Sequence, residues 1–145
     1  MMSREIDKNS IASTLERALA LGCLTGMSGA TFAVWFFNPT TAGFFPVCPL
    51  YSMTGLACPG CGMTRGLHAL LHGDVLTALD YNLLLPAILF FFGYLFVSLF
   101  LTFARGRALS FKLFNQKVLW GFFAVALCFS VLRNLPFYPF SILYP

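Results

Sequence analysis

Three apolar stretches that contain no charged residue alternate with more polar segments along this chain. The first two cover residues 18–37 and 83–104, which are 20 and 22 residues long. A helix that crosses a bilayer needs about 20 apolar residues, so each stretch predicts a transmembrane helix. The third stretch, between Lys117 and Arg133, has only 15 residues. It gives about 22 Å of helix, so both flanking cations would have to snorkel to the membrane surface.

This pattern predicts an all-α membrane protein with three transmembrane helices. We expect a Cys-rich extracytoplasmic segment between the first two helices, a basic cytoplasmic loop between the last two, and an interfacial tail. The expected ranges are 1–17 for a cytoplasmic N-terminal segment, 18–37, 83–104 and 118–133 for the helices, 38–82 for the Cys-rich segment, 105–117 for the loop and 134–145 for the tail. The first stretch exceeds the roughly 7–15 apolar residues of a removable signal peptide, so we expect an uncleaved anchor.

The Cys-rich segment regains helical spacing after its cysteines, which predicts an interfacial or re-entrant helical hairpin. A short helix is expected from Thr64 to His72, with apolar side chains on one face and polar ones on the other. Gly73 ends this helix, and Asp74 can cap a second one that runs to Tyr81. The apolar face carries Leu67, Leu70 and Leu71, and the polar face carries Arg65, His68 and His72.

Several small or polar residues in this pattern are expected to be structural. Asn82 is placed to cap the second transmembrane helix, which puts Pro86 in the first turn, where a missing N–H costs no hydrogen bond. Tight turns are expected at the glycines of the Cys-rich segment. The turn glycines are Gly60, Gly62 and Gly73.

Small residues recur at every fourth position of the first predicted transmembrane helix. They are Ala18, Gly22, Gly26 and Ala30. A face of small side chains lets a second helix approach closely. We therefore expect other membrane proteins, besides the lipid bilayer, to be partners of this chain.

The composition excludes a soluble globular protein and gives an orientation. Hydrophobic residues make up 59% of the chain, charged residues only 10%, and the mean hydropathy is +0.81. The net charge of +4 is therefore not a nucleic-acid footprint. Cations are retained on the cytoplasmic side, and seven of the nine lie in segments 1–17 and 105–117. We expect the N-terminus to be cytoplasmic, with the Cys-rich segment and C-terminus outside the inner membrane of a bacterium.

Cys48, Cys58 and Cys61 are the candidate chemical groups of the Cys-rich segment. Cys58 and Cys61 form a CxxC motif just before a predicted helix, where a disulfide can form and a thiol pKa can be lowered. One interpretation is thiol-disulfide exchange, with Cys48 as the resolving partner. The other is a structural disulfide that staples the loop, which an oxidising compartment would favour. Cys23 and Cys128 fall inside predicted membrane helices and are interpreted as small apolar residues.

A metal site is a third interpretation of the same cysteines. With the two histidines they give the spacing C-x2-C-x6-H-x3-H, whose ligand types suit zinc. His72 would lie about 12 Å along its helix from the cysteine loop, too far for one tetrahedral ion. The candidate ligands are Cys48, Cys58, Cys61 and His68. The sequence requires no cofactor, and zinc is the one it allows.

Arg65, Asp74 and Arg133 are isolated charges and candidate binding residues. A charge near hydrocarbon is costly unless it is paired or hydrated. A salt bridge from Arg65 or Arg133 to Asp74 would tie the central segment to the C-terminal end. The alternative is an anion site, such as a lipid headgroup or a substrate, because arginine offers a planar fork that matches phosphate and carboxylate.

The motifs together resemble a known family. The residues that carry the likeness are Cys48-Pro49, Thr54-Gly55-Leu56, Cys58-Pro59-Gly60-Cys61-Gly62, Thr64-Arg65, Gly73-Asp74, Asn82 and Arg133-Asn134-Leu135-Pro136 with Pro139-Phe140. In this order they resemble the signature of the small bacterial membrane proteins of domain of unknown function family 2752. The resemblance implies a membrane location and a Cys-rich signature, and it implies no activity.

The sequence favours an accessory or interaction protein over an enzyme, without deciding between them. Three short spans with no acid inside the membrane and no internal repeat are a poor basis for a transporter or channel. A thiol-disulfide exchange enzyme is the competing hypothesis. The state of the thiols separates the two, since a structural staple is inert and an exchange enzyme can be trapped with its partners.

Overall fold

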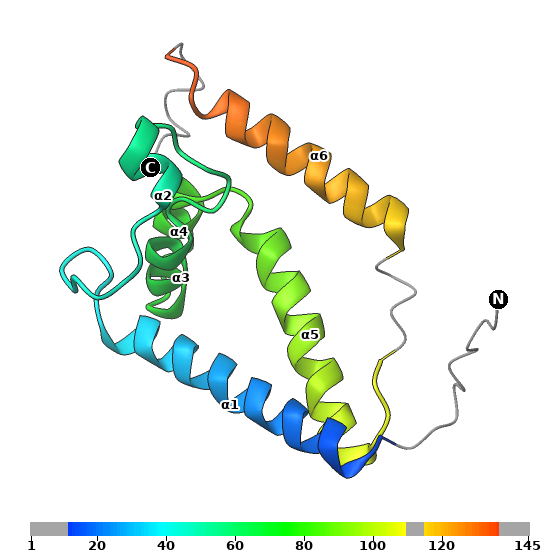
Figure 1. Cartoon of the computed structure of the whole chain (residues 1–145). Helices are drawn as coiled ribbons and strands as arrows, with labels where there is room; N and C mark the ends of the chain where they lie inside the picture. Colours follow the sequence, from blue (N-terminus) through cyan, green and yellow to red (C-terminus); the bar gives the residue numbers. More distant parts are fainter. Residues whose placement is uncertain (1–11, 110–114, 137–145) are drawn as a thin grey trace.

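The structure, a computed structural model, describes residues 12–109 and 115–136 and is all-helical within them (Figure 1). The N-terminal residues, part of the basic loop and most of the predicted tail lie outside the described residues. No strand occurs in the described part, as predicted. The helices are α1 (Thr14–Phe36), α2 (Pro49–Thr54), α3 (Met63–Leu71), α4 (Val75–Tyr81), α5 (Leu85–Arg105) and α6 (Gln116–Leu132).

The long helices α1 and α5 run antiparallel and diverge from one end, as Figure 1 shows. They meet where the backbone N–H of Ala12 donates to the carbonyl of Gly106 at 2.8 Å. α1 begins four residues before the predicted stretch because Ser13 and Glu16 form a reciprocal capping box. The far ends of α1 and α5 both contact α3, which packs on α4.

α3 and α4 form the predicted helical hairpin at this open end. Gly73 joins them at a φ of +85°, and the Asp74 side chain caps α4 by accepting from the Thr77 N–H at 3.1 Å. The turn at Gly73 and the cap by Asp74 are both as predicted from the sequence. None of the helices α2 to α4 exceeds nine residues, so each of these three is too short to cross a bilayer.

Gly66 lets α3 and α4 pack closely. It is buried, and a Cβ at this position would lie 2.9 Å from the Ala78 carbonyl oxygen and 3.3 Å from a methyl group of Leu85. The carbonyl belongs to helical backbone and cannot swing away. A side chain at Gly66 would therefore push α4 off α3.

We expect Gly66→Ala to destabilise the protein by about 1–3 kcal/mol, the usual cost of overpacking. The free energy of unfolding in detergent measures this loss. Gly121→Ala on α6 is the matched control, because nothing lies within 4 Å of a Cβ there and alanine favours a helix. Equal stability of the two variants would show that α3 and α4 can separate without cost.

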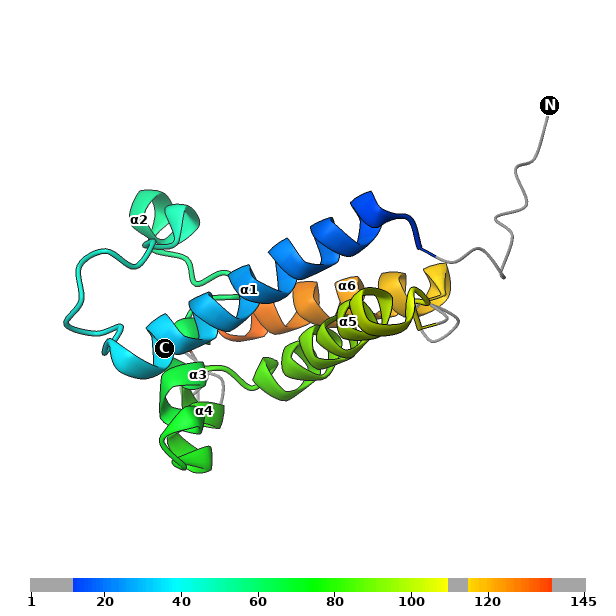
Figure 2. The ribbon, with the colours of Figure 1, turned by 90° about the horizontal axis from the view of Figure 1, so that it is seen from below.

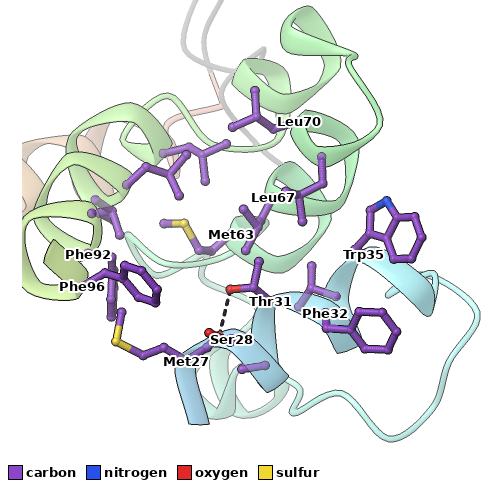
Figure 3. A pocket seen from close by; sticks show the side chains of 17 residues that line it. Met27, Ser28, Thr31, Phe32, Trp35, Met63, Leu67, Leu70, Phe92 and Phe96 are labelled. Atoms are coloured by element: carbon purple, nitrogen blue, oxygen red, sulfur yellow. Dashed lines mark hydrogen bonds between the residues drawn. The ribbon is translucent and has the colours of Figure 1, made fainter. Parts of the chain in front are cut away.

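An apolar cavity of about 800 Å³ lies where α1, α3 and α5 enclose the open end. Figure 3 shows Met63, Leu67 and Leu70 of α3 directed into it, opposite Phe92 and Phe96 of α5. The predicted apolar face of α3 is therefore the face that meets the long helices.

α1 and α5 are the two helices of the described chain that are long and apolar enough to cross a membrane. Many of their apolar side chains are exposed, as at Phe90 of α5, which is exposed over 68% of its surface. Outward apolar surface of this extent suits contact with lipid. α6 is apolar but has only 17 residues, so the predicted third crossing is not established.

The C-terminal end of α6 reaches the cysteine loop through Arg133 and Asn134. Figure 2 shows α2, α3 and α4 beyond the same end of the long helices. Gly22 and Gly26, in the predicted packing stripe, face open space, with no atom within 4 Å of a Cβ. At these two glycines, no helix of the described chain packs against the stripe.

Candidate metal centre

The three cysteines of the Cys-rich segment come together at one point. Cys48 is the N-cap of α2, and Cys58 and Cys61 flank the turn before α3. The Cys58 Sγ lies 3.3 Å from the Cys48 Sγ and 3.4 Å from the Cys61 Sγ. All three sulfur atoms lie within 4.8 Å of one another.

Backbone geometry fixes the positions of these cysteines. Pro49 starts α2 immediately after Cys48, where a missing N–H costs nothing. The Cys61 N–H donates to the Cys58 carbonyl at 3.0 Å, which closes a tight turn. Gly62 then begins α3 at a φ of +83°, a conformation that a residue with a Cβ rarely adopts. Gly60 is not among the glycines with a positive φ, and a Cβ there would meet the Cys58 Sγ at an ordinary contact distance of 3.8 Å, so neither backbone strain nor crowding explains its presence.

Asn82, the C-cap residue of α4, holds the cysteine turn in place. Its Nδ2 donates to the carbonyls of Pro59 at 2.8 Å and Cys61 at 3.1 Å, and the side chain is 1% exposed. Asn82 is not the N-cap as predicted, because α5 begins at Leu85 with Leu84 as its N-cap. Its Oδ1 nevertheless accepts from the Leu84 N–H at 2.9 Å, so the side chain does satisfy a backbone donor at the start of α5. Pro86 does lie in the first turn, as predicted. The amide of Asn82 joins the turn to the start of α5.

Arg133 and Asn134 hold the same turn from the end of α6. The Arg133 guanidinium is fully buried and donates from one nitrogen to the carbonyls of Cys58 at 3.0 Å and Cys61 at 3.1 Å. The Asn134 amide exchanges two hydrogen bonds of 2.8 Å with the backbone of Ala57. Arg133 therefore does not snorkel to a membrane surface as predicted. The burial of Arg133 is compensated by charge-assisted hydrogen bonds.

The predicted salt bridges to Asp74 are absent from the described part of the chain. Arg133 points to the cysteine turn, and the Asp74 carboxylate accepts from the Thr77 N–H. The Thr77 side chain, together with this N–H, holds the pKa of Asp74 below its usual value. Arg65 is exposed on α3 and makes no ion pair with a described residue. The C-terminal end is therefore connected to the central segment, but through hydrogen bonds from Arg133 to backbone carbonyls rather than through a salt bridge to Asp74.

The predicted disulfide between Cys58 and Cys61 is also absent, because all five cysteines are free thiols. A disulfide brings two sulfur atoms to about 2.05 Å, whereas these sulfur atoms are 3.4 Å apart. Cys48 lies as close to Cys58 as Cys61 does, so neither pairing is preferred. Cys23 and Cys128 are exposed on α1 and α6 and do not belong to the cluster.

The environments of Cys48 and Cys61 separate their pKa values. The backbone N–H of Tyr51, with help from the Cys58 thiol, lowers the pKa of Cys48 from 9.0 to about 7. Burial, with the Cys58 side chain, raises the pKa of Cys61 from 9.0 to about 12. At neutral pH the Cys48 sulfur is therefore substantially a thiolate, whereas Cys61 keeps its proton until another positive charge arrives.

His68 and His72 lie apart from the cysteine cluster. The His68 Nδ1 is 2.6 Å from the Val34 carbonyl of α1, and the His72 Nδ1 is 2.8 Å from the His68 carbonyl. A carbonyl only accepts, so each Nδ1 carries the proton. Among the described residues the metal-capable group contains only the three cysteines. His68 instead ties α3 to the end of α1.

Sequence reasoning included Asn82 and Arg133 but assigned them the wrong partners, and it gave Asn134 and Gly66 no role. The adjacent pair Arg133-Asn134 stands out as polar at the end of an apolar helix, which was a usable signal. Their partners are a backbone N–H and several backbone carbonyls, groups that nearly every residue has. No side-chain pattern could have identified those carbonyls.

Three converging cysteines can hold a thiophilic metal ion such as zinc. Zinc binds thiolate sulfur at about 2.3 Å, which in a tetrahedral site separates sulfur atoms by about 3.8 Å. The spacings of 3.3 and 3.4 Å need only a small expansion to reach that value. Three protein ligands leave one coordination position open.

Comparison with known proteins places this centre inside a family match. Neither the search of curated proteins nor the search of solved structures found a match to the chain. The match to a protein family covers all three cysteines, α3, α4 and the first half of α5, and ends before Arg133 and Asn134. Residues 48–96 match the family described as Protein of unknown function (DUF2752), so the resemblance seen in the sequence is confirmed over this segment.

Proposed function

We propose that this protein is a small multi-pass inner-membrane protein that binds one thiophilic metal ion, such as zinc, through Cys48, Cys58 and Cys61. The observation that carries the proposal is the convergence of three sulfur atoms within 4.8 Å on a turn held by Asn82 and Arg133. A preformed set of soft ligands lowers the ordering cost of metal binding. Thiolate ligands favour zinc or monovalent copper over magnesium or calcium.

The charges near the cluster support a bound divalent ion. Three thiolates carry three negative charges, and a divalent ion reduces the net charge of the centre to minus one. The buried Arg133 guanidinium, hydrogen-bonded to the carbonyls of Cys58 and Cys61, supplies the remaining positive charge. A buried site with balanced charge avoids most of the penalty of an isolated buried ion.

The bound ion would act mainly as a structural tie, consistent with an accessory or interaction protein. It would join the N-cap of α2 to the turn before α3, and Arg133 joins that turn to α6. Fixing these segments creates a rigid extracytoplasmic surface at one end of the long helices. The membrane helices would then present their outward faces to lipid and to partner helices.

The cations support the proposed orientation. Arg105 and Arg107 lie at the end where Ala12 meets Gly106, and the cysteine cluster lies at the other end. Cations are retained in the cytoplasm, so the cluster would face outward. Both the cluster and the end of α6 would then lie on the extracytoplasmic side.

Thiol-disulfide exchange is the second candidate, and the position of Cys58 between two thiols favours it. The Cys48 thiolate would attack a partner's disulfide, forming a mixed disulfide and releasing one partner thiolate. Cys58 would then lose its proton and displace the partner's second sulfur, leaving a Cys48–Cys58 disulfide. The partner gains two electrons, and the cysteine pair loses them.

Metal content and thiol labelling distinguish the two candidates and test the orientation. Protein purified without oxygen is expected to contain one metal ion per chain, measured by elemental mass spectrometry. In intact spheroplasts, a membrane-impermeant maleimide should label the cluster only after a chelator has removed the metal. Metal-free protein that is trapped with partners in Cys58→Ser would overturn the metal proposal in favour of exchange. Labelling only in inside-out vesicles would reverse the orientation.

A further inference from the structure

A second, smaller cavity lies on the polar side of α3 and is separate from the cysteine cluster. Its volume is about 210 Å³, and it opens between the end of α1, α3 and α4. Its polar lining residues are Asn38, Thr40, Arg65, His68, Thr77 and Tyr81. Each of these side chains can donate a hydrogen bond, and no acidic side chain lines the cavity.

Arg65 gives this cavity its positive charge. Its guanidinium has no ion pair within the described part of the chain. The acids of the neighbouring helix do not line the cavity. Asp74 is engaged with the Thr77 N–H, and Asp80 is exposed on α4. A guanidinium with five donors therefore remains available to a ligand.

The other donors are arranged around Arg65 by contacts within the protein. The Thr40 hydroxyl donates to the Asn38 Oδ1 at 2.6 Å, which leaves the Asn38 amide nitrogen to donate elsewhere. His68 uses its Nδ1 proton on the Val34 carbonyl, so its Nε2 donates only when the ring is protonated. Arg65, Tyr81 and the Asn38 amide nitrogen are therefore the donors that we expect a ligand to meet.

Aromatic residues place this cavity at the level of the lipid headgroups. It begins at Asn38, two residues after the end of α1. The Trp35 ring stacks on His72 with centroids 6.3 Å apart, and Phe36, Phe37 and Phe44 form a chain of ring contacts at the same end. Tryptophan is enriched at membrane–water interfaces, so Trp35 supports this placement. The apolar side of α3 faces the larger cavity shown in Figure 3.

We propose that this cavity binds a phosphate group, with Arg65 as its cation and Tyr81 as a second donor. Lipid headgroups and free phosphate share this chemistry, and arginine matches it with two parallel hydrogen bonds. The site uses none of the cluster residues, so it does not depend on metal binding. It gives a role to the exposed arginine that directly follows the cysteine turn.

Lipid binding to the full chain tests this site. Native mass spectrometry in detergent would compare phosphatidylglycerol binding with phosphatidylcholine binding for wild type and variants. We expect Arg65→Ala to weaken phosphatidylglycerol binding at least about tenfold, Arg65→Lys to restore part of it, and Tyr81→Phe to weaken it a few-fold. Arg107→Ala is the control, because it removes the same charge from an exposed position at the other end of α5. An unchanged elution volume in size-exclusion chromatography and an unchanged free energy of unfolding in detergent would show that the variants are folded.

A second titration identifies the source of the phosphate. Inorganic phosphate is added to delipidated Trp120→Phe protein, in which Trp35 is the remaining tryptophan and reports through its contact with His72. A fluorescence change that Arg65→Ala abolishes would identify free phosphate as a ligand. A response to phosphatidylglycerol alone would identify a lipid headgroup. Equal binding of both probes by wild type and Arg65→Ala would overturn the proposal.

Discussion

Replacing Cys61 by serine should lower the affinity for metal by more than about 100-fold. Loss of a residue that only supports a metal ligand costs about 10–100-fold, and loss of a ligand costs more. Cys61 is the most buried of the three cysteines, and its thiol contacts the Cys58 Sγ at 3.4 Å. A serine hydroxyl is a poor ligand for a thiophilic ion at neutral pH. Competition with a chromogenic chelator measures the affinity.

The controls for this variant are present in the same chain. Cys23→Ser and Cys128→Ser remove exposed thiols from α1 and α6 and should leave the affinity unchanged. Cys48→Ser should weaken binding as well, because it removes a second ligand. If Cys61→Ser held its metal as tightly as wild type, the cluster would not be the metal centre.

The same assay has an expected dependence on pH. Metal binding must expel the proton of Cys61, whose pKa is raised to about 12, so the affinity should rise at least about tenfold per pH unit at neutral pH. Cys48 has a pKa lowered to about 7, so it is already ionised above that pH. Below that pH it carries a proton, which metal binding must release. The slope should therefore be steeper below pH 7 than above it, by about one proton. Cys61→Ser should lower the slope above pH 7 by about one proton.

Local signals in the sequence predicted most of the helices. Charge-free length located α1 and α5, and the alternation of faces located α3. Asp74 was identified as the cap of α4 because a cap is a contact between residues close in sequence. The start of α1 was placed too late because the capping box of Ser13 and Glu16 precedes the apolar stretch.

The contacts that build the candidate site were not predictable in this way. Cysteines with the same spacing suit a disulfide, an exchange site or a metal, and only the positions of the sulfur atoms in space favour one. Arg133 reaches the Cys58 carbonyl across 75 residues of sequence. An arginine often pairs with a carboxylate, so the sequence predicted a salt bridge between Arg133 and Asp74. The fold instead brings it to two carbonyls that only the turn geometry exposes.

Arg133→Met should disrupt the cysteine turn more than any other single change outside the cysteines. Arg133 is fully buried, and one of its nitrogens donates to the carbonyls of both Cys58 and Cys61. Methionine preserves much of the volume but cannot donate to the carbonyls of Cys58 and Cys61. A buried polar group that loses its hydrogen bond costs about 1–3 kcal/mol of stability. It also removes the positive charge that balances the proposed metal centre. We expect lower abundance in membranes and a metal affinity about 10–100-fold weaker.

Two further variants separate the charge of Arg133 from its hydrogen bonds. Arg133→Lys keeps the charge but lacks the planar fork, so it should recover metal affinity only in part. Asn134→Ala removes the bonds to Ala57 without changing any charge, so it should lower stability while affecting metal affinity less. Wild-type metal affinity in Arg133→Met would mean that Asn82, which donates to Pro59 and Cys61, holds the turn unaided. The end of α6 would then be attached to the cysteine centre without controlling it.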